Sequence, residues 1–508
     1  MIPDPLDLNP VIANPGIPQP HDPQAILKRV SFALIVALLL LRAVMAAKLP
    51  LSADEAYYWL WSQHLAAGYF DHPPMIAWLI WPGTQIFGDT PLGVRLAGVI
   101  LSLPACWFVW QAAALILKND ALAVLALLFF NLTLMVSVEL LAATPDMPST
   151  VTSAAMIYFL ARVQAKNEGL SWLGVGVSAG LGLLSKFSVL FLGGGVLLWM
   201  VLDGGARKWL ASPWPYLAAA LALLIDAPNL IWQAHHHWQT LAFQFGRVGT
   251  GHFTLRFLGE FLAAQLGLAT PLIFVLMAIG LWHATRLANA ARLGDGTGES
   301  NGRVMLAMLV WVGLGYFFAH ALHDRVQGNW PCFLYPALVI LAADTASFGA
   351  RERWIALAAA PLALVLVLLV YVQAQFQPFA LKKDPLARML GREFAPIGDV
   401  VAALVKSHLA DAVLTTDYET TAWLRFNQPD LPVIQVNEPQ RFADAPPADA
   451  KLLQRSLIYL AEFRRDQHPL VQQLFAYTGF PTQLQTPSSL YMVYPVGRPK
   501  SSPIGKMP

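Results

Sequence analysis

The sequence predicts an α-helical polytopic membrane protein with about eleven crossings and a small C-terminal α/β domain outside the membrane. Of its 508 residues, 56% are hydrophobic and only 13% are charged, whereas soluble proteins carry about 25% charged residues. A soluble chain of this size would need solvated surfaces, for which the charges are too few. The net charge of +2 gives no reason to expect nucleic acid as a partner. Two cysteines, both in apolar stretches, exclude a disulfide framework and a cysteine-based metal site.

The apolar runs define the predicted membrane domain, residues 28–376, with a long first outer loop over residues 50–91. Each run approaches the length that crosses about 30 Å of hydrocarbon. The runs are residues 30–49, 92–117, 121–141, 148–163, 170–186, 187–203, 213–233, 257–283, 304–322, 331–347 and 354–374. A single helix over residues 170–203 would be about 50 Å long at ~1.5 Å per residue. That stretch is interpreted as two short helices turning at Ser185–Lys186, with one bent helix as the alternative.

Two segments flank the membrane domain. Residues 1–27 are predicted to be a disordered cytoplasmic arm, because residues 1–26 hold seven prolines and little hydrophobic pattern. Residues 377–508 contain "AVLTTDY", "LPVIQV", "SLIYLAE" and "LYMVYPV", which have the composition of strands and turn-rich flanks. Helical stretches lie between them, so this segment predicts an extracytoplasmic α/β domain.

The distribution of lysine and arginine predicts that the N-terminus lies inside. The inner connections hold Lys28, Arg29, Lys118, Arg162, Lys166, Arg207, Lys208, Arg286, Arg292, Arg303, Arg351 and Arg353. The outer side holds Lys48, Arg95, Lys186, Arg247, Arg256 and Arg325. Eleven crossings then place the C-terminal domain outside the membrane.

The outer connections also hold most of the polar side chains that could perform chemistry. These are Asp54, Glu55, Tyr57, Tyr58, Asp71 and His72 in the first outer loop, Asp146 in the second, Lys186 at the next outer turn, Arg247 in the fourth and Asn329 in the fifth. Ionisable groups in or beside a membrane are costly, so a functional pocket on the outer face is the default hypothesis.

Each group also has a purely structural interpretation. Asp54–Glu55 could cap the following helix, and Asp146 could cap another. The aromatic stripe Tyr57, Tyr58, Trp59 and Trp61 is typical of an interfacial anchor, and Lys186 could extend to the membrane surface. The run His235–His237 lacks a second ligand group at a fixed spacing, so no metal site is predicted.

One pattern in this loop, "DEAYYWLWSQHLAAGYFDHPP", resembles the bacterial branch of the dolichyl-phosphate-mannose protein mannosyltransferase superfamily. That superfamily (the GT-C fold, glycosyltransferase family 39 type) includes the lipid A aminoarabinose transferase. The marker is the Asp-Glu pair after the first helix, followed by Pro-Pro. The segments "ATPDMP", "GLLSKFSV" and "GNWPCFLYPAL" look like later landmarks, and the likeness covers roughly residues 30–375.

The resemblance assigns roles to residues. Asp54 corresponds to the catalytic carboxylate, Glu55 to its acidic neighbour, and Lys186 to a basic position associated with the lipid phosphate. The chain departs from the aminoarabinose enzyme by having Asp71-His72 in place of Glu-Lys, and Ala-Tyr in place of Thr-Arg after the Asp-Glu pair. These changes remove two fixed positive charges near the expected donor site and speak against aminoarabinose as the sugar.

The resemblance implies transfer of a sugar from a polyprenyl-phosphate donor to an extracytoplasmic glycan, lipid or protein acceptor, with membrane lipids around the protein. It also implies a place in a bacterial inner membrane, with the active site and the C-terminal domain on the periplasmic side. Asp54 would act as base in an inverting reaction, and Lys186, Arg247 or His72 would stabilise the phosphate leaving group. No cofactor is expected, and no metal either, because the chain lacks an Asp-x-Asp motif. The alternative is a lipid or sugar transporter (a flippase). The sequence shows no repeated halves of the sort found in many transporters.

Overall fold

The computed structural model describes residues 23–246, 252–292, 301–446 and 449–500. Their contacts divide the chain into two compact units. The helical unit comprises the described residues of Met1–Val44, Ala97–Leu141 and Pro145–Leu369. The mixed unit comprises those of Met45–Leu96, Ala142–Thr144 and Val370–Pro508. The first outer loop therefore groups with the C-terminal region, while the predicted boundary after residue 376 stays a prediction.

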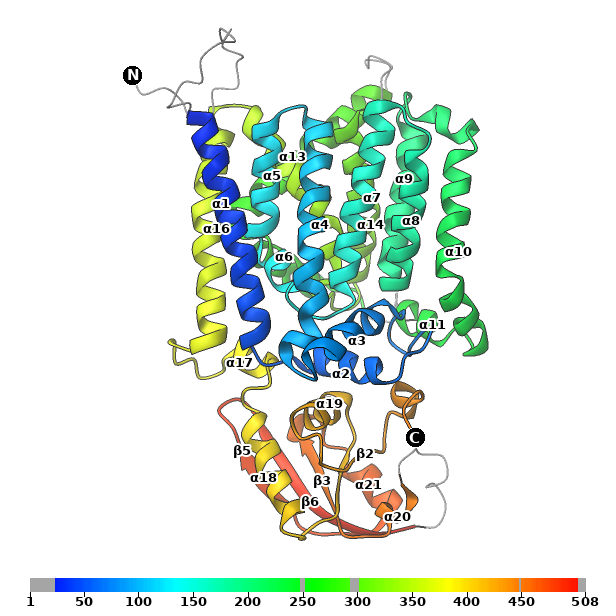
Figure 1. The fold of residues 1–508 in the computed structure, drawn as a ribbon, viewed down its shortest axis with the longest axis vertical. Coiled ribbons are helices and arrows are strands. Elements are labelled where there is room, and N and C mark those ends of the chain that lie inside the picture. Colours follow the sequence, from blue (N-terminus) through cyan, green and yellow to red (C-terminus); the bar gives the residue numbers. More distant parts are fainter. Residues whose placement is uncertain (1–22, 247–251, 293–300, 447–448, 501–508) are drawn as a thin grey trace. The chain divides into compact units, whose positions relative to one another are not determined.

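Long helices build the helical unit, and in Figure 1 they run up and down the view beside one another. The elements that lie in it wholly or in part are α1 (Pro23–Lys48), α4 (Pro91–Leu117), α5 (Asp120–Leu132), α6 (Leu134–Glu139), α7 (Asp146–Lys166), α8 (Ser171–Ser185), η1 (Phe187–Val189), α9 (Leu190–Leu202), η2 (Arg207–Ala211), α10 (Trp214–His235), α11 (Gln239–Phe245), α12 (Arg256–Leu268), α13 (Pro271–Arg292), α14 (Gly302–Ala321), η3 (Trp330–Leu334), α15 (Tyr335–Asp344), η4 (Thr345–Ser347) and α16 (Ala350–Phe376). Helix α8 packs against α7 and α10, and α9 packs against α14.

Within the described residues, seven helices are long and apolar enough to cross a membrane. Four shorter apolar helices accompany them: Met75–Phe87, Asp120–Leu132, Ser171–Ser185 and Phe187–Leu202. The predicted turn at Ser185–Lys186 is confirmed, because α8 ends at Ser185 and Lys186 has an extended backbone with φ −161° and ψ 132°.

Two predicted continuous runs are broken. Residues 257–283 form the end-to-end helices α12 and α13, which separate at Ala269 and Thr270, the latter at φ +66°. Pro271 is the first residue of α13. Proline suits this position because the N–H groups of the first helical turn have no partner within the helix, so the missing N–H of proline costs nothing there. Residues 121–141 break at Thr133, whose hydroxyl accepts a hydrogen bond from the Val136 N–H and caps α6.

The mixed unit contains a six-stranded sheet and short helices. Its elements are α2 (Ala53–Gln63), α3 (Met75–Phe87), α17 (Pro385–Met389), α18 (Ala395–Lys406), β1 (Ala412–Thr415), α19 (Tyr418–Asn427), β2 (Val433–Gln435), η5 (Pro439–Phe442), α20 (Ala450–Leu453), β3 (Leu457–Glu462), η6 (Phe463–Arg465), α21 (His468–Leu474), β4 (Phe475–Thr478), β5 (Thr482–Gln485) and β6 (Leu490–Pro499). The ends of α1, α4 and α16 also belong to this unit.

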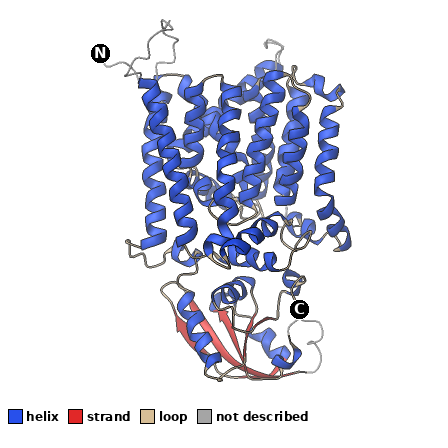
Figure 2. Cartoon of the chain, in the orientation of Figure 1, coloured by secondary structure: helices blue, strands red, loops and turns tan. Residues whose placement is uncertain are grey.

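The sheet has the strand order β2-β1-β3-β6-β4, with β5 also paired to β6. Figure 2 shows its strands in red. Strand β1 pairs in parallel with β2 and β3, and β6 pairs antiparallel with β3, β4 and β5. The four strands predicted from the sequence are β1, β2, β3 and β6, so the prediction of a mostly helical chain with a small C-terminal sheet is confirmed.

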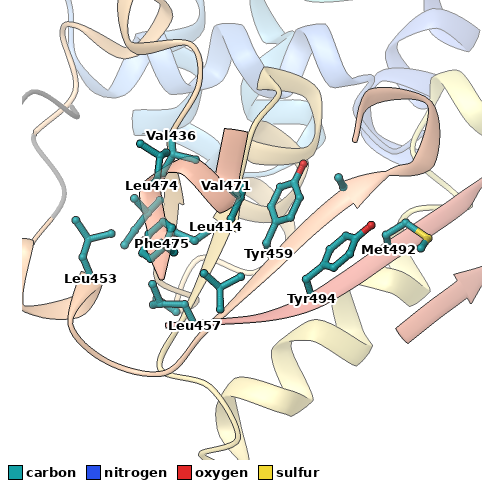
Figure 3. Packing of buried hydrophobic residues seen from close by; sticks show 14 residues of the cluster. Leu414, Val436, Leu453, Leu457, Tyr459, Val471, Leu474, Phe475, Met492 and Tyr494 are labelled. Atoms are coloured by element: carbon teal, nitrogen blue, oxygen red, sulfur yellow. The ribbon is translucent and has the colours of Figure 1, made fainter. Parts of the chain in front are cut away.

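A hydrophobic cluster holds the sheet together (Figure 3). Leu414 of β1, Tyr459 of β3 and Tyr494 of β6 are buried in it, together with Val471 and Phe475. The Tyr459 ring stacks on Tyr494 with centroids 5.7 Å apart. This packing fixes the carboxyl end of β1, which leads into α19 and the residues of the candidate site.

Candidate functional site

The structure divides the residues predicted from the sequence between the two units. The mixed unit holds those of the first outer loop, and the helical unit holds Asp146, Lys186 and Asn329. Arg247 lies outside the described residues. Each group is described by itself.

The start of α2 leaves the Asp54 carboxylate available. Ser52 is the N-cap residue, and its hydroxyl accepts a hydrogen bond from the Glu55 N–H at 3.3 Å. Glu55 completes the capping box, because its Oε2 accepts a bond from the Ser52 N–H at 2.9 Å. The capping interpretation therefore applies to Ser52 and Glu55, and Asp54 takes no part in the cap.

Glu55 is anchored by further contacts. Its Oε1 and Oε2 accept hydrogen bonds from Arg95 at 2.6 and 2.8 Å, and Oε1 also accepts one from the Ala143 N–H at 3.0 Å. Burial disfavours the charged carboxylate, but Arg95 and these hydrogen bonds outweigh it and lower the pKa of Glu55. The predicted binding role of Glu55 stays a prediction, while its observed contacts are those of a structural anchor.

The carboxylate of Asp54 has a different environment. Its Oδ1 accepts a hydrogen bond from the Tyr418 hydroxyl at 3.0 Å, across 364 residues of sequence. Asp54 is exposed to solvent, yet protein atoms crowd its carboxyl and the resulting desolvation raises its pKa to about 6. The Tyr418 bond lowers that pKa, while repulsion from Glu419, Asp71 and Glu55 raises it. The pKa of this carboxyl therefore lies above the usual range for aspartate.

A second carboxylate, Asp71, is buried beside the first. Its Oδ2 accepts a hydrogen bond from the Tyr57 hydroxyl at 2.7 Å, and the Arg441 guanidinium forms an ion pair with it. The guanidinium also lies over the Tyr418 ring, 4.7 Å from the centroid. Tyr57 and Asp71 are two of the positions at which the chain departs from the aminoarabinose pattern, and both contact this C-terminal arginine.

The sheet explains how Tyr418 and Arg441 come together. Strands β1 and β2 are parallel neighbours, so their carboxyl ends lie at one edge of the sheet. Asp417 ends the turn after β1 and N-caps α19 by accepting a hydrogen bond from the Thr420 N–H at 3.0 Å. The side chain of Gln435, at the end of β2, accepts a hydrogen bond from the Glu438 N–H at 2.9 Å and shapes the turn that leads to Arg441.

Tyr418 and Arg441 were not predicted from the sequence, although one signal was present. Polar residues at the carboxyl ends of neighbouring parallel strands are a common source of functional groups. The segments "AVLTTDY" and "LPVIQV" were predicted as strands, but their parallel pairing was not.

The aromatic residues of α2 are packed inside the protein. Tyr57, Tyr58 and Trp61 are 2, 7 and 4% exposed, and the Trp61 ring stacks on Tyr69 with centroids 4.3 Å apart. Their interpretation as an interfacial anchor is wrong, because an anchor would present its rings to lipid. The half-buried His72 lies with its ring 6.1 Å from that of Tyr58.

In the helical unit, Asp146 lies at the centre of a buried network. Its Oδ1 is 2.6 Å from the Lys186 Nζ and 3.0 Å from the Cys332 Sγ. Its Oδ2 accepts a hydrogen bond from the Asn329 Nδ2 at 2.9 Å. Pro145, not Asp146, occupies the N-cap position of α7, so the capping interpretation of Asp146 is wrong. Lys186 is 9% exposed and ion-paired, so its amine does not extend to the membrane surface.

No described residues form a group of three or more His, Cys, Asp or Glu side chains with metal-site geometry. His236 stacks on the Trp232 ring at 3.9 Å, and its Nδ1 lies 2.8 Å from the Trp232 carbonyl oxygen.

The fold matches that of two solved structures of ArnT. ArnT from Cupriavidus metallidurans in the apo state superposes with a TM-score of 0.62 at 16% identity, covering 91% of this chain and 97% of that chain. The same enzyme bound to undecaprenyl phosphate superposes with a TM-score of 0.60 at 16% identity and the same coverage. The chain therefore has the GT-C fold.

Sequence comparisons point to glycosyltransferases. Residues 71–232 match the family model described as dolichyl-phosphate-mannose-protein mannosyltransferase. The lipid A galacturonosyltransferase RgtD of Rhizobium johnstonii is 29% identical over 299 residues, 57% of this chain and 59% of that protein. The undecaprenyl phosphate-α-4-amino-4-deoxy-L-arabinose arabinosyl transferase 1 of Proteus mirabilis is 25% identical over 289 residues, 54% of this chain and 49% of that protein.

The chain thus spans about half of the length of the curated relatives it matches. The family model and the relatives are those of glycosyltransferases, and the solved structures show the GT-C fold. The resemblance predicted from the sequence is confirmed, and the chain is a multi-pass membrane protein.

Proposed function

We propose that this protein transfers a sugar from a polyprenyl-phosphate donor to an extracytoplasmic acceptor, with Asp54 as the general base. The observation that carries the proposal is the Asp54 carboxylate itself, which titrates at a pKa of about 6 and has one oxygen held by Tyr418. A base is most effective when its pKa lies near the working pH. The names of the relatives support the reaction class.

The step is a displacement at the anomeric carbon of the donor sugar. The acceptor hydroxyl oxygen forms the new bond to that carbon while the bond from the carbon to the phosphate oxygen breaks, and its electron pair leaves with the polyprenyl phosphate. The acceptor proton passes to the Asp54 carboxylate, which afterwards releases it to water. Attack opposite the leaving group inverts the anomeric configuration.

The leaving group is already a stable phosphate anion, so it needs charge stabilisation rather than a strong acid. The roles of Lys186, Arg247 and His72 in that stabilisation, and of Tyr58, Asp146 and Asn329 in binding, stay predictions. Because the Lys186 amine is already paired with Asp146, any phosphate would have to share this cation with a buried carboxylate.

Relatives named as lipid A and lipopolysaccharide core galacturonosyltransferases make a galacturonosyl donor and a lipopolysaccharide-type acceptor the first to test. The bacterial origin of the relatives supports a place in the bacterial inner membrane. The lysine and arginine distribution supports the mixed unit on the periplasmic side.

The test uses the full chain purified in lipid nanodiscs, with polyprenyl-phosphate galacturonic acid as donor and lipid A as acceptor. We expect released polyprenyl phosphate and glycosylated lipid A in equal amounts, each dependent on both substrates. Donor that crosses the bilayer of proteoliposomes intact, with no phosphate released from galacturonosyl, pentosyl or hexosyl donors, would identify a transporter instead.

A further inference from the structure

The described residues of the C-terminal α/β region reach the Asp54 carboxylate directly. Tyr418 opens α19 and donates its hydroxyl proton to Asp54 Oδ1 at 3.0 Å. Asp54 has no other hydrogen-bond partner within the described chain. Its Oδ2 is therefore the oxygen available to an acceptor hydroxyl.

Two side chains pack against the Tyr418 ring. The Arg441 guanidinium lies 4.7 Å from its centroid, and the Tyr57 ring lies 4.9 Å away at a tilt of 51°. Arg441 is fixed in turn by its ion pair with Asp71. A cation over an aromatic face is attracted to it by the ring quadrupole, so the ring has little freedom to rotate.

The surrounding contacts hold α19 against α2. The Trp423 Nε1–H donates a hydrogen bond to the Leu51 carbonyl oxygen at 3.2 Å, and Trp59 packs edge-on against Phe426 with centroids 5.1 Å apart. The hydroxyl of Tyr418 therefore approaches Asp54 from a rigid support, as a positioning group must.

We propose, on the basis of the function proposed above, that Tyr418 is a positioning residue for the catalytic base, held in place by Arg441. The C-terminal region is then part of the catalytic machinery and not only an attached domain. Its hydroxyl orients Asp54 by holding Oδ1, leaves Oδ2 toward the acceptor, and favours the ionised carboxylate. Burial and the neighbouring acids Asp54 and Glu419 raise the pKa of the Tyr418 phenol. The phenol therefore stays protonated and cannot accept the proton of the acceptor hydroxyl.

Several groups act on the Asp54 carboxylate and must be considered together. Tyr418 favours its charged form, whereas Glu419 on α19, Asp71 on the first outer loop and Glu55 on α2 oppose it by repulsion. The ion pair of Arg465 with Glu419, at 2.6 Å, moderates one of these repulsions.

The experiment compares pH profiles of kcat for Tyr418→Phe and the wild-type full chain. The variant removes one oxygen and keeps the contacts of the ring with Arg441 and Tyr57. Loss of a hydrogen bond to a charged group should move the acid limb to higher pH by about one pH unit. At pH values below the limb, kcat should fall about tenfold, with KM for the donor unchanged. Tyr477→Phe, a change at a half-exposed tyrosine of β4, is the matched control and should leave the profile unmoved.

Two further variants make the result decisive. Glu419→Gln removes a repulsive neighbour and should move the acid limb to lower pH, which shows that the limb reports Asp54. Arg441→Lys keeps a positive charge but loses the planar stacking group, and should move the limb upward less than Tyr418→Phe does. An acid limb unmoved in both Tyr418→Phe and Arg441→Lys would overturn the inference. An inactive Asp54→Asn alongside that result would leave the proposed function intact, whereas an active Asp54→Asn would remove the function itself.

Discussion

Glu55 and Arg95 form a bidentate ion pair in which both side chains are almost completely buried, at 1 and 2% exposure. The guanidinium also donates hydrogen bonds to the carbonyl oxygens of Leu49 and Pro50 at 2.7 and 2.8 Å. This arrangement joins the end of α1, the start of α2 and the start of α4. The two acidic residues of the pair therefore have different roles. Glu55 anchors the backbone at the start of α2, and this anchor fixes the position of the neighbouring Asp54.

The first prediction concerns this ion pair. Glu55→Ala leaves the buried Arg95 guanidinium without its counter-charge, and breaking a buried pair in this way costs about 3–5 kcal/mol. Thermal unfolding of the purified protein should therefore begin at a clearly lower temperature. Glu168→Ala is the matched control, because its pair with Arg162 is solvent-exposed, at 34 and 29% for the two side chains, and should contribute little to stability. Equal thermal stability of the two variants would contradict the anchoring role.

The second prediction separates two roles for Lys186. Lys186→Met removes the partner of a buried carboxylate, so it should destabilise the protein by about 3–5 kcal/mol. Adding Asp146→Asn should recover part of that loss, because an amide can stay buried with Asn329 and Cys332 at lower cost. The thermal unfolding of the two single variants and the double variant gives the coupling. Should Lys186→Met stay as stable as the wild type and lose only affinity for the donor, the phosphate-binding role predicted from the sequence would replace this one.

The third prediction follows from the titration of Asp54. Transfer requires the ionised carboxylate, so kcat should rise with pH through a single acid limb near the pKa of about 6 and level off above it. The measurement is the initial rate between pH 4.5 and pH 8, at saturating donor and acceptor, as roughly ten evenly spaced points. A rate that is flat over this range, or that falls as pH rises through 6, is incompatible with Asp54 as a base.

The helices could be predicted well because each crossing requires a long apolar run, and that run stands out in the sequence. The break between α12 and α13 was missed although a proline, Pro271, follows it directly. The reason is that the hydropathy of the sequence stays high across the break. Strands β4 and β5 were missed because they are short, and most of their side chains are exposed. Neither shows the hydrophobic pattern of a buried strand.

Only the part of the candidate site that lies within one stretch of sequence could be predicted. Asp54, Glu55 and Asp71 lie in one loop and form a recognisable pattern. Tyr418 and Arg441 reach that loop across 364 and 370 residues, and the pairing of β1 with β2 brings them together. No local pattern encodes such a long-range approach, so the tertiary fold alone shows which C-terminal side chains face the acidic loop.

The fourth prediction concerns membrane topology. Single cysteines at His64 and Ser407, both exposed, should react with a membrane-impermeant thiol reagent in intact spheroplasts. Cysteine at Lys166, exposed on the predicted inner side, should react only after the membrane is opened. The two natural cysteines are buried, so the background should be low. The reverse pattern would place the mixed unit in the cytoplasm and exclude a periplasmic reaction.

The most direct test of the central claim is the turnover of Asp54→Asn. Asparagine keeps the size of the side chain and, because the capping box uses Ser52 and Glu55, leaves the helix start unchanged. It removes the proton acceptor, and loss of a general base lowers rates by about 10²–10⁴-fold. Asp430→Asn, at an exposed carboxylate in the same unit, is the matched control and should keep wild-type turnover. We predict that Asp54→Asn melts at the wild-type temperature and turns over at least about a hundredfold more slowly at saturating donor and acceptor; turnover above about a tenth of the wild-type rate would contradict the assignment of Asp54 as the base.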